Sequence, residues 1–146
     1  MNELLMLLQP LLISTALGTG IGLERQWGRK PAGLRTHVLV CLGSTTLLLI
    51  TKYAEAYIGG PNLDPTRTIQ GLVTGVGFIG AGCIMRSKDG VHGITTAATI
   101  FIAATIGIAV GVHAYVLAST VTALSLIILI GGRKVDKWLP AKDVPE

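Results

Sequence analysis

Residues 64–82 read DPTRTIQGLVTGVGFIGAG, an apolar stretch with a glycine at almost every turn. No charged residue falls between Thr68 and Met85. Glycine weakens a helix in water, but in lipid the helix keeps its hydrogen bonds internally and small residues let neighbouring helices approach. The stretch therefore predicts a central transmembrane helix. Its packing positions are predicted to be Gly71, Gly75, Gly77, Gly80 and Gly82.

The composition of the whole chain is typical of a membrane protein. Of its 146 residues, 50% are hydrophobic and only 14% are charged, and the mean hydropathy is +0.63. Further uncharged runs cover residues 4–23, 93–112 and 114–132, each close to the roughly 20 residues that cross a bilayer. A shorter uncharged run, extended to residues 34–57, predicts one more span.

We therefore expect an all-α polytopic membrane protein with about five transmembrane helices and glycine-rich packing. The transmembrane domain is expected to occupy residues 1–132, and residues 133–146 to form an interfacial tail. The pattern GxxxG, which allows close helix contacts, occurs at Gly71 and Gly75 and again at Gly107 and Gly111.

Lysine and arginine are distributed unevenly over the predicted loops. Of the twelve, only Lys52 and Arg67 fall on one side. The others are Arg25, Arg29, Lys30, Arg35, Arg86, Lys88, Arg133, Lys134, Lys137 and Lys142. Since basic residues concentrate in cytoplasmic loops, we expect an outside N-terminus and a cytoplasmic C-terminus. The net charge of +4 then reflects topology and contact with lipid headgroups, and no nucleic-acid partner is expected.

The inner end of the first span carries the first candidate site residue. Gly18 and Gly22 would let a second helix cross closely, and they bring Glu24 to the membrane boundary. Glu24 is there either a functional carboxylate that could bind Mg²⁺, or a solvated charge paired with a neighbouring basic residue such as Arg25.

Arg35, Thr36 and His37 enter the second span together. Charged side chains at the mouth of an apolar helix are costly unless they meet a partner. Glu24 is the nearest acidic residue in the sequence. We therefore predict an ion pair between Glu24 and Arg35 across the first two helices.

The remaining candidates lie in and around the third and fourth spans. Arg67 follows the start of the third span and is expected to pair with a nearby carboxylate or a lipid headgroup, and Arg86 lies in the basic turn. His92 stands at the inner boundary, where a lone histidine is more often interfacial than a proton relay. Thr95 and Thr96 begin the fourth span, where their hydroxyls can bond to carbonyls or across to a neighbouring helix.

Several of these motifs occur together in one known family. They are GLERQ ending at Gln26, AGLRTH at 32–37, Arg67, GVGFIGAG at 75–82 and GITTAAT at 93–99. Over about residues 15–132 the chain resembles the MgtC/SapB family of bacterial inner-membrane proteins, in a short form without the cytosolic C-terminal domain of longer members. By position, the family's acidic residue falls on Glu24, and its arginines on Arg25, Arg35, Arg67 and Arg86.

The resemblance implies a five-helix inner-membrane domain linked to magnesium homeostasis and, in pathogens, to survival in host phagocytes. Such members are also implicated in restraining the membrane part of the ATP synthase. Where virulence-type members carry an asparagine followed by V-R-G, this chain has GVHG at residues 90–93. The resemblance therefore does not by itself assign a virulence role to this chain.

Two functions remain open at this stage. One is a non-enzymatic protein that binds and regulates another inner-membrane protein, such as the ATP synthase. The other is a transporter or channel subunit for Mg²⁺ or another small ion, with Glu24 as an oxygen ligand. The regulator is favoured because Mg²⁺ prefers carboxylates and water, and no acidic residue lies inside the four uncharged runs that predict spans. We expect no cofactor, and a homo-oligomer, since so few helices enclose little volume.

Overall fold

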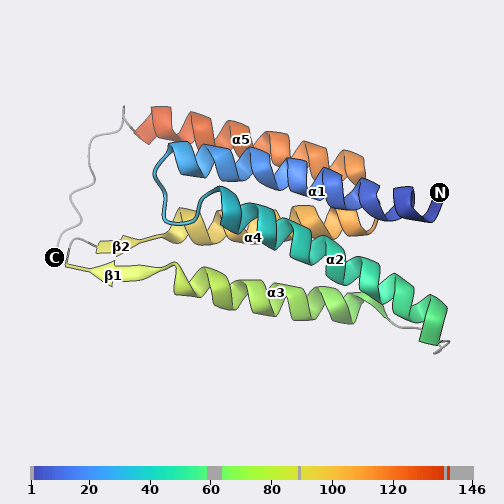
Figure 1. Ribbon diagram of the computed structural model, residues 1–146. Coiled ribbons are helices and arrows are strands. Elements are labelled where there is room, and N and C mark those ends of the chain that lie inside the picture. The colour runs from blue at the N-terminus through green and yellow to red at the C-terminus, as the bar shows by residue number, and fades with distance from the viewer. Residues whose placement is uncertain (1, 59–63, 89, 137, 139–146) are drawn as a thin grey trace.

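The computed structural model describes residues 2–58, 64–88, 90–136 and 138, which form a helical bundle with one short pair of strands (Figure 1). The helices are α1 (Asn2–Trp27), α2 (Leu34–Ile58), α3 (Pro65–Gly82), α4 (Ile94–Gly111) and α5 (Tyr115–Asp136). Strands β1 (Met85–Ser87) and β2 (Gly90–His92) pair antiparallel between α3 and α4. The expectation of an all-α polytopic membrane protein is confirmed.

Four helices in the described ranges are long and apolar enough to cross a membrane, namely α1, α2, α4 and α5. The span predicted from the shortest uncharged run, α2, is thus among them. α3 is not, because its first turns carry Thr66, Arg67, Thr68 and Gln70. The prediction that α3 is the central helix is wrong: α4 is, with 56% of its span buried against 33% for α2.

α3 nevertheless runs along the edge of the bundle from one end to the other (Figure 1). Near its start the hydroxyls of Thr51 in α2 and Thr68 in α3 lie 2.9 Å apart. Near its end Gly80 faces Ala97 of α4. Because α2 ends and α4 begins at opposite ends of the bundle, the chain has to return between them, and α3 is the segment that returns. α3 is therefore the fifth helix to cross the bundle, and it does so because the chain must return there and not because the helix is strongly apolar.

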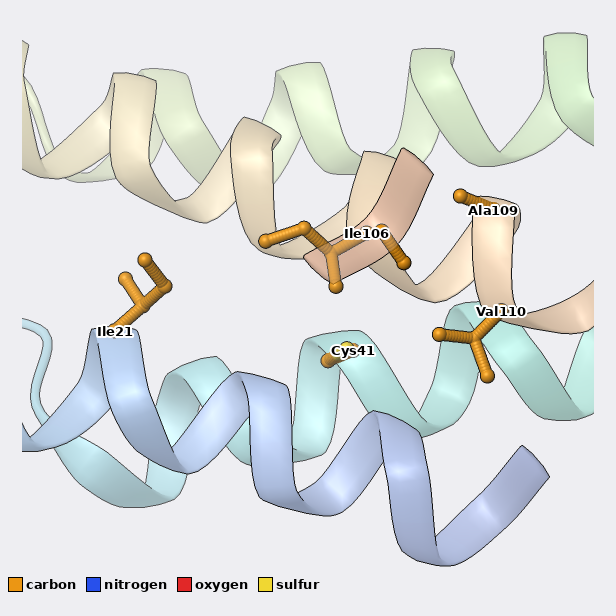
Figure 2. Packing of buried hydrophobic residues seen from close by; sticks show 6 residues of the cluster. Ile21, Cys41, Ile106, Ala109 and Val110 are labelled. Atoms are coloured by element: carbon orange, nitrogen blue, oxygen red, sulfur yellow. The ribbon is translucent and has the colours of Figure 1, made fainter. Parts of the chain in front are cut away.

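The interior lies where α1, α2, α4 and α5 meet. Figure 2 shows Ile21 of α1, Cys41 of α2 and Ile106, Ala109 and Val110 of α4 between the helices, and a buried alanine of α5 completes the cluster. Each of these side chains is at most 8% exposed. Since lipid tails are as apolar as these groups, close packing rather than transfer out of water holds such helices together.

Two glycines of α1 allow the close crossing with α2. A Cβ atom on Gly22 would lie 2.7 Å from the Cα of Leu34, and one on Gly18 would lie 3.2 Å from the carbonyl oxygen of His37. Both distances are shorter than ordinary van der Waals contacts. Gly18 and Gly22 therefore stand at a helix contact, where the sequence placed them.

Two glycines of α4 bring this helix equally close to α2. A Cβ atom on Gly107 would overlap the carbonyl oxygen of Cys41, and one on Gly111 would lie 2.6 Å from the Cβ of Leu48. The hydroxyl of Thr45 donates to the Gly107 carbonyl at 2.9 Å. The α2–α4 contact is therefore a backbone-to-backbone approach with a hydrogen bond across it.

The glycines of α3 behave differently from these. A Cβ atom on Gly80 would lie 3.5 Å from the Cβ of Ala97, an ordinary contact. At the other four positions it would meet nothing within 4 Å, and these are Gly71, Gly75, Gly77 and Gly82. Among the described residues, these four glycines therefore do not pack against another helix of the chain, and their predicted role in helix packing stays a prediction. The reason is that α3 lies at the edge of the bundle and contacts α4 and, to a smaller extent, α2.

The turn between α3 and α4 contains a hairpin that the sequence did not predict. Its strands align Met85 with His92. Gly93 follows with φ of +90°, and a Cβ atom there would overlap the carbonyl oxygen of Cys83. Only glycine fits this combination of a left-handed backbone and a close approach, so Gly93 fixes how the hairpin enters α4.

Basic residues gather at the end of the bundle that carries the hairpin. Arg25, Arg29, Lys30 and Arg133 line one pocket there together with β2. Lys52 lies at the opposite end, where it lines a pocket beside the start of α5. The predicted segregation of basic residues is therefore present in the fold. Lys137 and Lys142, and most of the tail predicted over 133–146, lie outside the described residues, while α5 itself continues to Asp136.

Candidate functional site

A buried ion cluster joins α1 and α5 at the basic end. Glu24 is 5% exposed and Arg25 is 2% exposed. Arg25 Nε donates to Glu24 Oε2 at 2.7 Å. Arg133 Nη2, from the last turn of α5, lies 2.5 Å from Glu24 Oε1 and donates to the Glu24 carbonyl at 2.8 Å. Two guanidinium groups share one carboxylate, so the cluster carries one excess positive charge.

The predicted pair between Glu24 and Arg35 is wrong. Arg35 is exposed in the first turn of α2, whereas Glu24 is occupied by Arg25 and Arg133. Room for the second arginine comes from Gly28, because a Cβ atom there would overlap the guanidinium group of Arg133. Glu24 is thus paired with Arg25, as one interpretation of the sequence had it, but the pair is buried rather than solvated.

Arg133 is the functional candidate that the sequence reasoning missed, because it was assigned to the tail. A signal was present in the pattern of uncharged runs. The run of α1 ends at Leu23 and that of α5 ends at Gly132, and both helices run toward the same end of the bundle (Figure 1). The next charged residue of each run therefore stands at a similar depth, which brings Arg133 to Glu24.

A second buried polar contact joins α2 and α4. His37 is fully buried, and its Nδ1 lies 2.8 Å from the carbonyl oxygen of Gly33. Since a carbonyl only accepts, Nδ1 carries a proton. Nε2 lies 3.0 Å from the hydroxyl oxygen of Thr99, which is also 2.9 Å from the Thr96 carbonyl oxygen. His37 is therefore a polar cross-link between two helices, a role for which the sequence offered no partner.

The candidates of the hairpin and of the start of α4 lie near this end. Arg86 and His92 are exposed on the two strands, and the Nε2 of His92 lies 3.1 Å from the hydroxyl oxygen of Ser87. Thr95 is exposed in the first turn of α4, whereas Thr96 is 3% exposed. The two threonines therefore have different surroundings, although the sequence predicted the same hydrogen-bonding role for both.

Two further candidates stand apart from the ion cluster. Thr36 is half-buried in the first turn of α2. Arg67 is exposed in the first turn of α3 at the opposite end of the bundle, where its backbone N–H donates to the Asp64 carbonyl at 3.1 Å. The structure therefore does not bring Arg67 together with the other predicted site residues.

The cluster is poorly suited to hold a cation. Both oxygens of Glu24 contact guanidinium nitrogens, and neighbouring positive charges disfavour a bound metal ion. Among residues 2–58, 64–88, 90–136 and 138, no group of three or more His, Cys, Asp and Glu could hold a metal ion. What the arrangement offers instead is hydrogen-bond donors and positive charge.

The fold and this cluster define a polytopic helical membrane protein. At its basic end, a buried carboxylate of α1 pairs with one arginine of α1 and one of α5. Comparison with protein families makes this more specific. The model of the MgtC family matches residues 11–138, and the chain belongs to the MgtC family. The resemblance that the motifs indicated is confirmed.

Three similar curated proteins come from bacteria. The chain is 43% identical over 122 residues to the "Putative magnesium transporter YhiD" of Escherichia coli strain K12, covering 81% of this chain and 57% of that protein. It is 36% identical over 140 residues to protein SrpB of Synechococcus elongatus, covering 88% and 77%. It is 39% identical over 122 residues to protein MgtC of Salmonella typhimurium LT2, covering 82% and 50%.

The aligned region thus spans little more than half of YhiD and half of MgtC. No solved structure matches the chain.

Proposed function

We propose that this chain is a non-enzymatic protein of the inner membrane that acts by binding another integral membrane protein, and that this activity serves magnesium homeostasis. Its N-terminus lies outside and its basic end lies in the cytoplasm, in keeping with the usual enrichment of Lys and Arg on the cytoplasmic side. The link to magnesium is supported by the name of YhiD. The ATP synthase is the candidate partner that the family resemblance supplies.

The observation that carries the proposal is the outward face of α3. Gly71, Gly75 and Gly82 are spaced by four and seven residues, so they share one side of the helix. Phe78 lies on the same side and is 83% exposed. A Cβ atom on any of the three glycines would meet nothing within 4 Å in the described chain. We call the surface formed by Gly71, Gly75, Phe78 and Gly82 the α3 glycine face.

Such a face is built to receive a helix. Small residues let a second helix approach closely enough for van der Waals contacts along its length. A large side chain between small ones, as Phe78 is here, adds a ridge that fixes the crossing. The occupant we propose is a transmembrane helix of another membrane protein. A second copy of this chain, which would give a homo-oligomer, is the competing occupant.

The name of YhiD favours transport as the second candidate function. The ion cluster argues against a cation path through Glu24, because both carboxylate oxygens are taken by arginines. The same two arginines line a pocket together with Arg29 and Lys30. A dehydrated Mg²⁺ ion requires oxygen ligands, and these groups are donors instead.

Ion flux separates the two functions. The purified chain is placed in proteoliposomes that contain a Mg²⁺-sensitive dye, and external Mg²⁺ is added. The proposal expects entry no faster than in protein-free vesicles. Rapid entry that Glu24→Ala abolishes would overturn it in favour of a transporter.

A growth assay tests the role of the α3 glycine face. We expect Gly75→Ile to abolish the growth that the wild-type chain restores at low Mg²⁺ to cells lacking their own copy. Gly43→Ile is the matched control, because Gly43 is exposed on α2 and a Cβ atom there would also meet nothing within 4 Å. Both variants should accumulate equally in the membrane. Equal growth with the two variants would contradict the proposal.

A further inference from the structure

The basic end of the bundle contains a pocket of about 720 Å³. Its walls are the end of α1 with the loop that follows, strand β2, the first turn of α4 and the last turns of α5. Pockets that bind small molecules typically measure about 300–1,000 Å³. The cavity is therefore large enough for a ligand, and the function proposed above makes no use of it.

The charge of this pocket is strongly one-sided. Arg25, Arg29, Lys30 and Arg133 line it, and among the described residues no Asp or Glu lines it. Glu24 offsets only one of these charges through its contacts with Arg25 and Arg133. Positive charges held this close repel one another. An anion in the pocket would remove that cost.

Two arginines that line the pocket each have a buried donor atom without a partner in the described chain, namely Arg25 Nη1 and Arg133 Nε. Arg25 is 2% exposed, and while its Nε and Nη2 donate to Glu24, its Nη1 has no hydrogen-bond partner in the described chain. A buried donor left unsatisfied costs about 1–3 kcal/mol, and more when it is charged. Native proteins rarely tolerate such a group unless something outside the chain satisfies it.

The first turn of α4 adds donors at the same place. Gly93 is the N-cap and has no side chain with which to cap the helix, and Ile94, Thr95 and Thr96 line the pocket. The first N–H groups of a helix have no partner within it. The helix dipole also adds partial positive charge at this end, which makes an uncapped N-terminus a site for anions.

We propose that this pocket binds a phosphate group. Guanidinium groups match phosphate oxygens in pairs, and the lysine and the α4 N-terminus complete a set of donors on several sides. Ile94 and Ile128 also line the pocket and are 59% and 69% exposed, so an apolar wall adjoins the charged one. The phosphate belongs either to the headgroup of an anionic phospholipid or to free phosphate from solution.

The proposal does not depend on a partner for α3. The ion cluster, the unpaired Arg25 nitrogen and the α4 N-terminus lie at the end of the bundle, whereas the α3 glycine face runs along its side (Figure 1). A failure of one proposal leaves the other standing.

The experiment measures thermal unfolding of the full chain in nanodiscs of phosphatidylcholine. One arm adds inorganic phosphate, with chloride at equal ionic strength as the reference. The other arm replaces part of the lipid by phosphatidylglycerol. Stabilisation in the first arm identifies a soluble phosphate, and stabilisation in the second arm alone identifies a lipid headgroup. No stabilisation in either arm overturns the proposal.

A pair of double variants tests the position of the site. Arg29→Gln with Lys30→Gln removes two exposed charges from the pocket and leaves the buried cluster intact. Arg35→Gln with Arg86→Gln removes two exposed charges at the same end but outside it. We expect the first pair of substitutions to weaken the apparent affinity for the stabilising ligand, phosphate or phosphatidylglycerol, by about tenfold. This factor corresponds to the loss of two exposed charge contacts. If the second pair weakens the affinity equally, the effect comes from general surface charge, and the proposed location of the site is contradicted.

Discussion

Gly107 and Gly111 in α4 have the same spacing as Gly71 and Gly75 in α3, and the two helices pack side by side (Figure 1). On α4 the spacing brings the backbone against α2, where even one added carbon would overlap a carbonyl oxygen. On α3 a carbon added at Gly71 or Gly75 would meet nothing within 4 Å among the described residues. The spacing thus shows that a helix can be approached closely, but it does not say which helix approaches it.

The two surfaces therefore have different consequences for the molecule. The α4 surface is already filled within the chain, so its glycines matter for folding. The α3 glycine face is unfilled in the described chain, so its glycines matter for what the folded protein binds. Substitutions on the two surfaces should separate folding from binding.

The largest effect is expected for Gly107→Ala. The new methyl group would overlap the Cys41 carbonyl oxygen, and backbone cannot move aside as a flexible side chain can. We expect a loss of about 4 kcal/mol of stability, above the usual cost of overpacking. Thermal unfolding in mild detergent measures it, with Gly43→Ala as the control. If Gly107→Ala unfolds at the same temperature as the control, the α2–α4 contact is misassigned.

A slightly smaller loss is expected when the ion cluster loses its carboxylate. Glu24→Gln leaves the buried Arg25 and the half-buried Arg133 without a counter-charge, which should cost about 3 kcal/mol. Arg133→Gln leaves a neutral Glu24–Arg25 pair and should cost much less. The comparison of the two unfolding temperatures checks this order, and the reverse order would refute the shared carboxylate.

Loss of the polar contact between α2 and α4 should cost less again. Thr99→Val removes the hydroxyl beside His37 Nε2 while it keeps the shape of the side chain. We expect a loss of about 1.5 kcal/mol, typical of a buried group left without its hydrogen bond. Thr95→Val, on an exposed position near the start of the same helix, should change stability little. Identical unfolding of the two variants would show that His37 does not depend on Thr99.

The smallest effect on folding is expected on the α3 glycine face. Gly71→Ala and Gly75→Ala add a methyl group into open space and favour the helix by up to about 1 kcal/mol each. Both unfolding temperatures should therefore stay the same or rise. A clear fall in either one would mean that this face is packed within the chain after all.

The sequence was sufficient to predict the helices and the sorting of charge. Uncharged runs and the placement of Lys and Arg are one-dimensional patterns, and they identified an all-helical membrane bundle with one basic end. The sequence did not identify the central helix correctly. The density of glycine predicted α3, whereas α4 is the more buried helix. Burial depends on how many neighbours a helix has, which the sequence of that helix does not state.

The predicted site was recovered in part for a similar reason. Glu24, Arg25 and His37 were singled out, and all three are buried at or beside polar contacts. The sequence did not predict the distant residues that contact them, because Arg133 belongs to α5 and is far from Glu24 in the sequence. The choice between Arg35 and Arg133 is made by helix packing and by the space at Gly28, and neither is visible in local sequence.

Site-specific photo-crosslinking in native membranes tests the central claim, that the α3 glycine face binds another membrane protein. A photoreactive residue replaces Phe78 on α3 or, as the control, Val116 on α5, because each is 83% exposed. The account predicts that the Phe78 position is joined to a different integral membrane protein, that Gly75→Ile prevents this, and that the Val116 position reacts only with lipid. Adducts at Phe78 with lipid alone, or with a second copy of this chain, would contradict it.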